Sequence, residues 1–496
     1  MSVQLDYKRF HRRLRYLASK WKTDTESFQN VDAIALVIGD DDFENPYRKS
    51  IALQTWLLGH PFFQTLWIIK PNQVTVVCSH KKADAIETVK QGDKQVPVNV
   101  IRRGKNLEEN VELYKSVIED LNNKRVGVVV KDKFSGKNIE EWKKACETFK
   151  KNYEEIDIST AIGVCLAEKD EEEVRNVRTA AKVSSNVMQY YFVPEMSTLI
   201  DEEKPITHEK LSSNTEEVLE DPNMLSRIKL PPEVDNDKDL DWCYTPIIQS
   251  GGKFDLRSSA ASNNEKLYPG VIICSLGLRY KFYCSNIGRT FLIDPTKVQE
   301  KNYEFLLEVQ NKVLDSIRDG VKIKDIYQRA ISLVRAKRPD LEKNFTKNVG
   351  FGMGIEFREA NYVLNAKNNR ELKNGMIINV QVGFSDLTIN DDPAEFFRNG
   401  GWSSFLGSGS DDEGSGEESE SGSEFELEED EFEESSSDEE SEVDSYASEE
   451  SEEEEELTDS GEDWDELEEN ARRADERRAK RKGEFAEAPI KKKNRR

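Results

Sequence analysis

Few side chains in this sequence have the types and spacing that metal-dependent or nucleophilic chemistry requires. The 496 residues include six cysteines, none in a CxxC pair, so we interpret them as reduced thiols in an intracellular compartment. A G-x-S-x-G nucleophile motif is absent. Gly350, Gly352 and Gly354 are not followed by the Gly-Lys-Ser/Thr of a phosphate loop, and they are typical of a strand and turn instead. The four histidines are His11, His60, His80 and His208.

One stretch, SLGLRYKFYCSNIGRTF (275–291), resembles a metal-binding motif of the pita-bread aminopeptidase family. In that family two aspartates, eleven positions apart on neighbouring strands, bridge two divalent metals that activate a water molecule. The residues at the corresponding positions here are Ser275 and Asn286, which are also eleven apart. Neither of them is an anionic ligand.

The later elements of this resemblance are altered in the same way. The string GFGMGIEFRE has Phe351 at the position of a ligand histidine and Arg358 at that of a substrate-contacting histidine. GMIINVQVG has Gln381 at the position of a ligand glutamate. Because hard cations need carboxylate or imidazole ligands, we expect no metal, no cofactor and no catalytic residue here. The pocket is then either a surviving peptide-binding groove or a core filled by Phe351, and a hydrolase with altered ligands is the weaker alternative.

The elements that would position these residues form two units. Over residues 1–163, short apolar runs such as VDAIALVIG (31–39) alternate with amphipathic helices, which predicts an α/β N-lobe with a largely covered sheet. Residues 164–388 begin with long helices, the first expected to end before Pro194, and continue with strands rich in Ile, Val, Tyr and Phe. This order predicts an α+β domain of the pita-bread, aminopeptidase P-like type. No apolar run is long enough for a membrane span, so we expect no membrane contact.

Charge divides the rest of the chain sharply. Residues 411–469 contain 33 Asp and Glu and no Lys or Arg, whereas residues 470–496 carry a net charge of +8. Removing both from the total of −26 leaves residues 1–410 with a net charge of −1. We therefore predict a polar linker (389–410), a long disordered acidic tail (411–469) and a basic terminal segment with a helix (470–496). Sequence-specific DNA binding is not expected, since the body lacks a basic excess.

An inactive pita-bread domain behind an α/β lobe, followed by an acidic tail, resembles the large-subunit family of the FACT histone chaperone. The strings that carry the resemblance are VDAIALVIG, ALQTWLLG, PIIQSGG, FYCSNIGRT, KNVGFGMGIEFRE, GFSDLT, FFRNGGWSSFL, GEDWDELEENARRAD and KKKNRR. The family chain continues after GFSDLT with closing strands, a domain that docks the small FACT subunit and a middle domain. Here Thr388 runs directly into the linker. We therefore expect a pita-bread domain without its last strands and a doubtful contact with the small subunit, as in a splice form, a paralogue or an imperfect gene model.

The resemblance implies a nuclear, chromosomal protein that binds the histone 2A–2B dimer, with histones 3 and 4 as further partners, and that reorganises nucleosomes without ATP. Its setting would be transcription, replication and DNA repair. The alternative is a truncated decoy that binds histones but does not join the complex. The acidic tail attracts basic surfaces, and aromatic side chains in it are candidate anchors. These candidates are Phe425, Phe432, Tyr446 and Trp464.

Two further features of the tail suggest regulation and import. Ser435, Ser436 and Ser437 precede three acidic residues and are candidate sites for an acidophilic kinase, or else mere spacers. The basic end is a candidate nuclear import signal or, alternatively, a basic patch that folds back on the acidic tail or touches DNA. Its residues are Lys491, Lys492, Lys493, Arg495 and Arg496.

Overall fold

The computed structural model describes residues 4–40, 47–91, 96–252, 254–257 and 260–387. The linker, the acidic tail and the basic segment predicted above lie outside these residues. So do the candidate anchors, phosphorylation sites and import residues.

A six-stranded mixed sheet forms the centre of the N-lobe, in the order β4-β3-β2-β1-β5-β6. β1, β2 and β3 pair antiparallel, and the remaining pairs are parallel. Pro71 and Asn72 make the two-residue turn between β2 and β3, as their sequence predicts, because Lys70 pairs with Gln73. The strands are β1 (Ala33–Ile38), β2 (Thr65–Lys70), β3 (Gln73–Ser79), β4 (Val98–Arg103), β5 (Arg125–Val128) and β6 (Glu154–Asp157).

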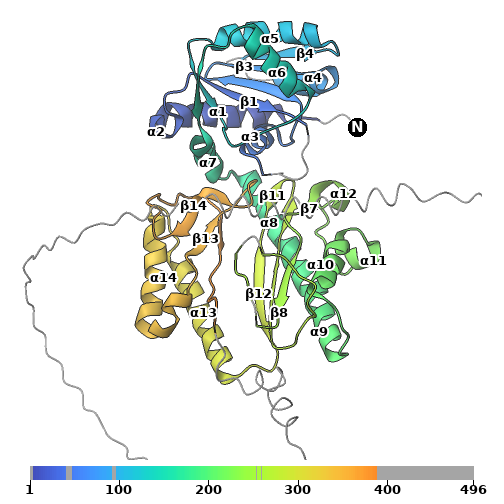
Figure 1. Cartoon of the computed structure of the whole chain (residues 1–496), viewed down its shortest axis with the longest axis vertical. Helices are drawn as coiled ribbons and strands as arrows, with labels where there is room; N and C mark the ends of the chain where they lie inside the picture. The colour runs from blue at the N-terminus through green and yellow to red at the C-terminus, as the bar shows by residue number, and fades with distance from the viewer. Residues whose placement is uncertain (1–3, 41–46, 92–95, 253, 258–259, 388–496) are drawn as a thin grey trace, which may run out of the picture. The chain divides into compact units, whose positions relative to one another are not determined.

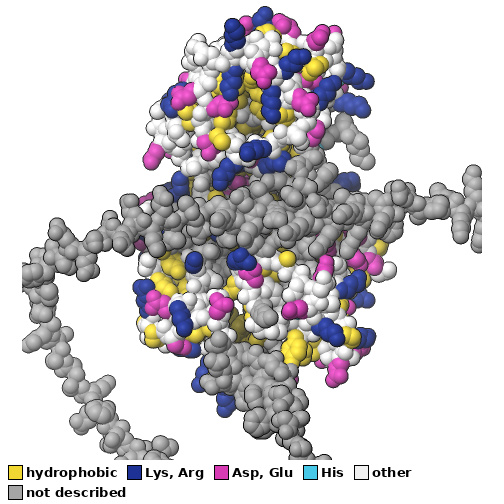
Figure 2. Space-filling view, in the orientation of Figure 1, with side chains coloured by type: hydrophobic (Ala, Val, Ile, Leu, Met, Phe, Trp, Pro, Cys, Tyr) yellow, Lys and Arg dark blue, Asp and Glu magenta, His cyan; other side chains and the backbone are white. Residues whose placement is uncertain are grey.

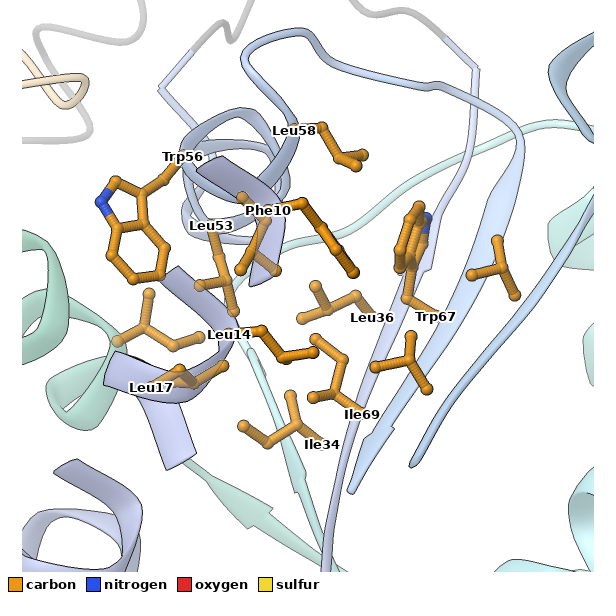
Figure 3. Packing of buried hydrophobic residues seen from close by; sticks show 14 of the residues in the cluster. Phe10, Leu14, Leu17, Ile34, Leu36, Leu53, Trp56, Leu58, Trp67 and Ile69 are labelled. Atoms are coloured by element: carbon orange, nitrogen blue, oxygen red, sulfur yellow. The ribbon is translucent and has the colours of Figure 1, made fainter. Parts of the chain in front are cut away.

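Helices cover both faces of this sheet (Figure 1). Alternation along β1 places Ile34 and Leu36 in one hydrophobic cluster and Ala33 and Ala35 in another. α1, α3 and α7 contribute to the first cluster, part of which Figure 3 shows, and α5 and α6 contribute to the second. The largely covered sheet is thus confirmed. The helices are α1 (Tyr7–Thr23), α2 (Thr25–Phe28), α3 (Lys49–Leu58), α4 (His80–Ile86), η1 (Glu87–Lys90), α5 (Leu107–Leu121), α6 (Lys137–Thr148) and α7 (Ser159–Ala167).

The second unit opens with a long helical segment that corrects one prediction. The helix does not end before Pro194, because the helical path continues from α8 through a π-helical turn, η2, into α9. Pro194 lies in the first turn of α9, where its missing N–H is tolerated. The helices of this part are α8 (Glu171–Val187), η2 (Met188–Phe192), α9 (Val193–Asp201), α10 (His208–Glu216), η3 (Glu217–Leu219), α11 (Pro222–Leu225) and α12 (Asn236–Asp239).

Three small antiparallel sheets follow, in the orders β11-β10-β7, β12-β9-β8 and β14-β13-β15. α14 packs on β13 and β14, and α13 packs on β15 (Figure 1). This arrangement confirms the α+β class. The strands are β7 (Leu240–Trp242), β8 (Ile247–Ser250), β9 (Val271–Leu276), β10 (Leu278–Tyr280), β11 (Tyr283–Cys284), β12 (Ile287–Leu292), β13 (Asn348–Gly352), β14 (Glu359–Asn365) and β15 (Ile378–Val380). The helices are α13 (Lys297–Ser316), α14 (Ile323–Lys337) and η4 (Pro339–Asn344).

None of the helices in the described ranges has the length and apolar composition needed to cross a membrane. The first predicted domain boundary, between residues 163 and 164, falls inside α7. The predicted limits of the N-lobe and of the pita-bread domain remain a proposal.

Candidate functional site

Ser275 and Asn286 lie side by side on neighbouring antiparallel strands. Ser275 is in β9 and Asn286 directly precedes β12, where Gly288 pairs with Ser275. The Ser275 Oγ and Asn286 Oδ1 atoms are 3.5 Å apart. This is where the resemblance to the aminopeptidases would place two metal-bridging carboxylates.

A tyrosine bridges these two side chains. The Tyr244 hydroxyl lies 2.7 Å from Ser275 Oγ and donates a hydrogen bond to Asn286 Oδ1. Burial raises the pKa of Tyr244 well above its ordinary value, so the phenol keeps its proton and can donate it. The Tyr244 ring and the backbone of Ser285 lie so close to Gly277 that only glycine fits at this position. An added Cβ would lie 2.3 Å from Ser285 O and 3.2 Å from the Tyr244 ring. A neutral hydrogen-bonded triad thus replaces two anionic ligands.

Aromatic rings occupy the space beside this triad. Phe351, in β13, is 3% exposed, and its ring centroid is 5.8 Å from that of Phe357. Phe357 packs edge-on against Tyr244 at 5.2 Å and also contacts Tyr47 of the N-lobe at 6.3 Å. We call Tyr47, Tyr244, Phe351 and Phe357 the aromatic cluster; all four are buried. This geometry favours the filled core over the open groove.

The other two predicted positions differ from each other. The Arg358 guanidinium lies over the Phe351 ring, 5.5 Å from its centroid, so Arg358 caps the aromatic cluster. Gln381 is exposed, and its backbone N–H donates to Val349 O beside β15. The structure thus gathers Ser275, Asn286, Phe351 and Arg358 around Tyr244 and Phe357, whereas Gln381 faces solvent.

The carboxylates nearest to the aromatic cluster in sequence are held in ion pairs. Glu356 accepts hydrogen bonds from Lys49 of α3 at 2.7 and 3.0 Å. Glu359 is buried and pairs with Lys169, whose ammonium also donates to Ala167 O at 2.9 Å. Burial raises the pKa of Glu359 to about 7 despite the lysine. Within the described ranges, no group of three or more His, Cys, Asp or Glu side chains could hold a metal ion.

The sequence did not indicate Tyr244 and Phe357, the two residues that connect the predicted positions to one another. Phe357 lies within the motif string, but its role depends on a partner 113 positions earlier in the chain. Tyr244 has no distinguishing local pattern, since it merely follows β7 and precedes Pro246. The buried pair Lys169 and Glu359 was likewise not anticipated.

Family models match three consecutive parts of the chain. Residues 5–161 match the N-terminal lobe domain of FACT complex subunit SPT16. Residues 175–413 match metallopeptidase family M24, and residues 414–494 match the C-terminal domain of FACT complex subunit SPT16.

Individual relatives give the same result. The FACT complex subunit ctc-2 of Neurospora crassa is 42% identical over 399 residues, which cover 78% of this chain and 38% of that protein. FACT complex subunit spt16 of Emericella nidulans is 41% identical over 393 residues, again covering 38% of its length. The chain therefore spans well under half the length of the curated relatives it matches.

Solved structures extend the comparison to the fold. The N-terminal domain of FACT complex subunit SPT16 from Cicer arietinum has a TM-score of 0.70 and 37% identity, covering 77% of this chain and 90% of that one. The corresponding domain from Eremothecium gossypii has a TM-score of 0.73 and 34% identity, with coverages of 79% and 92%. An X-Pro aminopeptidase from Thermotoga maritima, at 17% identity and a TM-score of 0.52 over 72% of this chain and 90% of that one, shares the fold alone.

Proposed function

Because this chain belongs to the family of SPT16 subunits of the FACT complex, we propose that it is a non-catalytic histone chaperone that binds the histone 2A–2B dimer. Its further partners would be histones 3 and 4 and the nucleosome. The observation that carries the proposal is the segment 411–469, with 33 acidic residues and no Lys or Arg, of which residues 414–469 match the family's C-terminal domain. Such a polyanion attracts strongly basic surfaces.

The absence of catalysis is part of the proposal, and it is supported by the geometry of the site. Tyr244, Ser275 and Asn286 satisfy one another with neutral hydrogen bonds, and Phe351 occupies the place of an imidazole. These side chains offer no anionic ligand to a metal cation that would activate a water molecule. The aminopeptidase-like fold then serves as a scaffold.

The described body contributes little long-range charge. On the face shown in Figure 2, Lys and Arg side chains are interspersed with Asp and Glu, without a continuous region of one sign. This agrees with the net charge of −1 for residues 1–410. Attraction to histones therefore resides in the acidic segment, which would compete with DNA for the same basic histone surface.

Specificity within the acidic segment would come from aromatic anchors. A buried aromatic side chain at an interface typically contributes about 2 kcal/mol or more. Phe432 and Tyr446 are the first candidates, followed by Phe425 and Trp464. Phosphorylation of Ser435, Ser436 or Ser437 would add about −1.5 to −2 charges per site and strengthen the attraction.

The basic end would supply nuclear import through Lys491, Lys492, Lys493, Arg495 and Arg496, which gives the protein access to chromatin. A second candidate function is favoured by the order of the family matches, since the match to metallopeptidase family M24 ends at residue 413 and the match to the C-terminal domain begins at residue 414. It would bind histones without joining the full complex and so act as a decoy. A pull-down with the small FACT subunit distinguishes the two functions, because only a complex member retains that subunit.

A competition experiment tests the chaperone proposal. Fluorescent histone 2A–2B dimers are bound to a DNA duplex, and the full chain is added at near-physiological salt. We expect the histones to be released from the DNA by the full chain. A matched control, in which the 33 acidic residues of 411–469 are replaced by Asn and Gln, should release none. Equal release by both chains would contradict the proposal.

A further inference from the structure

Helix α13 supplies three of the six large apolar side chains that are exposed in the described part of the chain, namely Val298, Leu307 and Leu314. Leu307 and Leu314 are 42% and 48% exposed. They are seven residues apart, which is about two helical turns, so they lie on the same face of the helix. Single exposed leucines are common, but a pair at this spacing is typical of a helix that packs against another helix.

The packing of α13 within its own domain leaves this face uncovered. The buried side chains of α13 include Val309 and Val313, which belong to the hydrophobic cluster shared with α14. At about 100° per residue, Leu307 and Leu314 lie about 150° around the helix axis from Val309. They are therefore directed away from the core of the domain, on the side of α13 that faces solvent.

Polar and charged side chains continue this face in both directions. Glu304 lies one turn before Leu307, and Asn311 lies between the two leucines. Arg318 follows the helix, and its guanidinium donates to Leu314 O at 3.3 Å. Glu304 and Arg318 are exposed, and neither forms an ion pair with another described residue. We call Glu304, Leu307, Asn311, Leu314 and Arg318 the α13 stripe, since their spacing of 3, 4, 3 and 4 residues is that of a coiled-coil seam.

The α13 stripe is complementary to a second copy of itself. When another α13 helix runs antiparallel, with a two-fold axis at Asn311, Leu307 of each copy lies against Leu314 of the other. The same arrangement brings Glu304 of each copy next to Arg318 of the other, because these residues lie seven positions before and after Asn311. A parallel arrangement would place like charges together. Charge complementarity therefore favours antiparallel pairing.

A second copy suits this face better than a strongly basic partner does. The α13 stripe has one acidic and one basic residue, so its net charge is zero and it exerts no long-range attraction on a polycation. We propose that two copies of the chain associate through antiparallel α13 helices, with Leu307 packed on Leu314 and Glu304 paired with Arg318. Because each copy contributes one helix, the dimer is weak and its population depends on concentration. This contact does not depend on the histone-binding proposal.

Sedimentation velocity of the full chain over a concentration series tests this association. The salt concentration should be about physiological, so that the acidic segments of the two copies are screened from each other. We expect a monomer–dimer equilibrium, and the double substitution Leu307→Ser and Leu314→Ser should raise its dissociation constant at least about tenfold. Leu107→Ser, at an exposed apolar residue of the N-lobe, is the matched control and should leave the dissociation constant unchanged. A chain that stays monomeric, or equal association by the double variant, would overturn the proposal.

A charge swap tests the pairing of Glu304 with Arg318. Glu304→Arg alone and Arg318→Glu alone each place like charges opposite one another in both halves of the dimer, so each should weaken association. The double variant restores an acidic and a basic residue at every contact and should associate more tightly than either single variant. A double variant that associates no better than the single ones would contradict the antiparallel register.

Cysteine crosslinking tests the position of the two-fold axis. In the full chain, Asn311→Cys places the new thiol next to its own copy, and mild oxidation should give a covalent dimer. The matched control is Glu300→Cys, also exposed on α13, whose two copies would lie about 33 Å apart in the antiparallel dimer and should not crosslink. The unsubstituted chain, in which five of the six cysteines are buried, gives the background. Crosslinking at both positions, or at neither, would overturn the proposal.

Discussion

The ring of Phe357 packs edge-on against that of Tyr244, with 5.2 Å between their centroids. This contact joins two loops that are far apart in sequence. Tyr244 lies in the loop after β7, and Phe357 lies in the loop between β13 and β14. Tyr244 is also hydrogen-bonded to Ser275 and Asn286, and the ring of Phe357 also packs against that of Phe351. The pair therefore fills the space beside Ser275 and Asn286, the two positions where the resemblance to the aminopeptidases would place metal-bridging carboxylates.

We expect no metal-dependent peptidase activity from the full chain. Addition of Mn²⁺, Co²⁺ or Zn²⁺ should produce no hydrolysis of X-Pro or Met peptides, since Ser275, Asn286 and Phe351 supply no anionic or imidazole ligand. A prolidase assayed in parallel confirms that the peptides and metals are competent. Hydrolysis that requires added metal and disappears in Asn286→Ala would contradict this account of the site.

The aromatic cluster should act as a structural core. Phe351→Ala removes a buried ring and leaves a cavity, which should lower the apparent free energy of unfolding by about 3 kcal/mol or more. Urea denaturation followed by circular dichroism measures the change. Val130→Ala, at an exposed site, should change stability by less than about 0.5 kcal/mol. A similarly small effect of Phe351→Ala would mean that the pocket is an open groove.

Glu359 should make stability depend on pH near neutrality. Burial raises the pKa of its carboxyl to about 7, above the value in the unfolded chain, so the folded state binds the proton more tightly. The contribution of Glu359 to stability is therefore fully present below about pH 4.3 and is lost as pH rises through about 7. It amounts to at most about 4 kcal/mol.

Thermal unfolding midpoints between pH 5 and pH 8 measure this effect. We expect the midpoint to fall across this range, and we expect the fall to be smaller in Glu359→Gln, which cannot ionise. Glu342→Gln, on an exposed ion pair with Arg335, is the matched control and should retain the pH dependence. Identical pH profiles for all three proteins would show that Glu359 does not titrate in this window.

The contributions of the aromatic anchors and of the acidic charge to histone binding can be measured separately. Phe432→Ala combined with Tyr446→Ala should weaken binding of the histone 2A–2B dimer at least about tenfold. The dependence of affinity on salt should stay the same, because no charge is removed. Isothermal titration calorimetry at several salt concentrations gives both quantities. The substitutions Ser435→Ala and Ser437→Ala in the unmodified protein serve as the control, and binding equal to that control would remove the anchor hypothesis.

Local patterns in the sequence predicted most elements, and long-range contacts account for the rest. The apolar spacing of Phe10, Leu14, Leu17 and Trp21 is that of one helix face, and all four side chains are buried in α1. β6 has no apolar pattern that would indicate a strand, because its sequence, EEID, is polar and only Ile156 is buried. The proline rule failed at Pro194, since the π-helical turn before it lets the helix continue.

The site itself could be predicted only in part. Motif spacing located Ser275, Asn286, Phe351 and Arg358, because each occupies a fixed position in a short string. The sequence could not predict whether the pocket is open or filled. That depends on Tyr244 and Phe357, whose rings are in contact although they lie in loops far apart in the sequence. No local periodicity encodes such a contact. The same holds for Lys169 and Glu359, which are 190 positions apart.

The central claim is that the acidic segment makes this chain a histone-binding protein. The most direct test is a titration of histone 2A–2B dimers into the full chain and into a version that stops at Leu406, at about physiological salt, where screening acts over roughly 8 Å. We predict tight binding by the full chain and none by the shortened one. Equal affinities, or no binding by either chain, would contradict the claim.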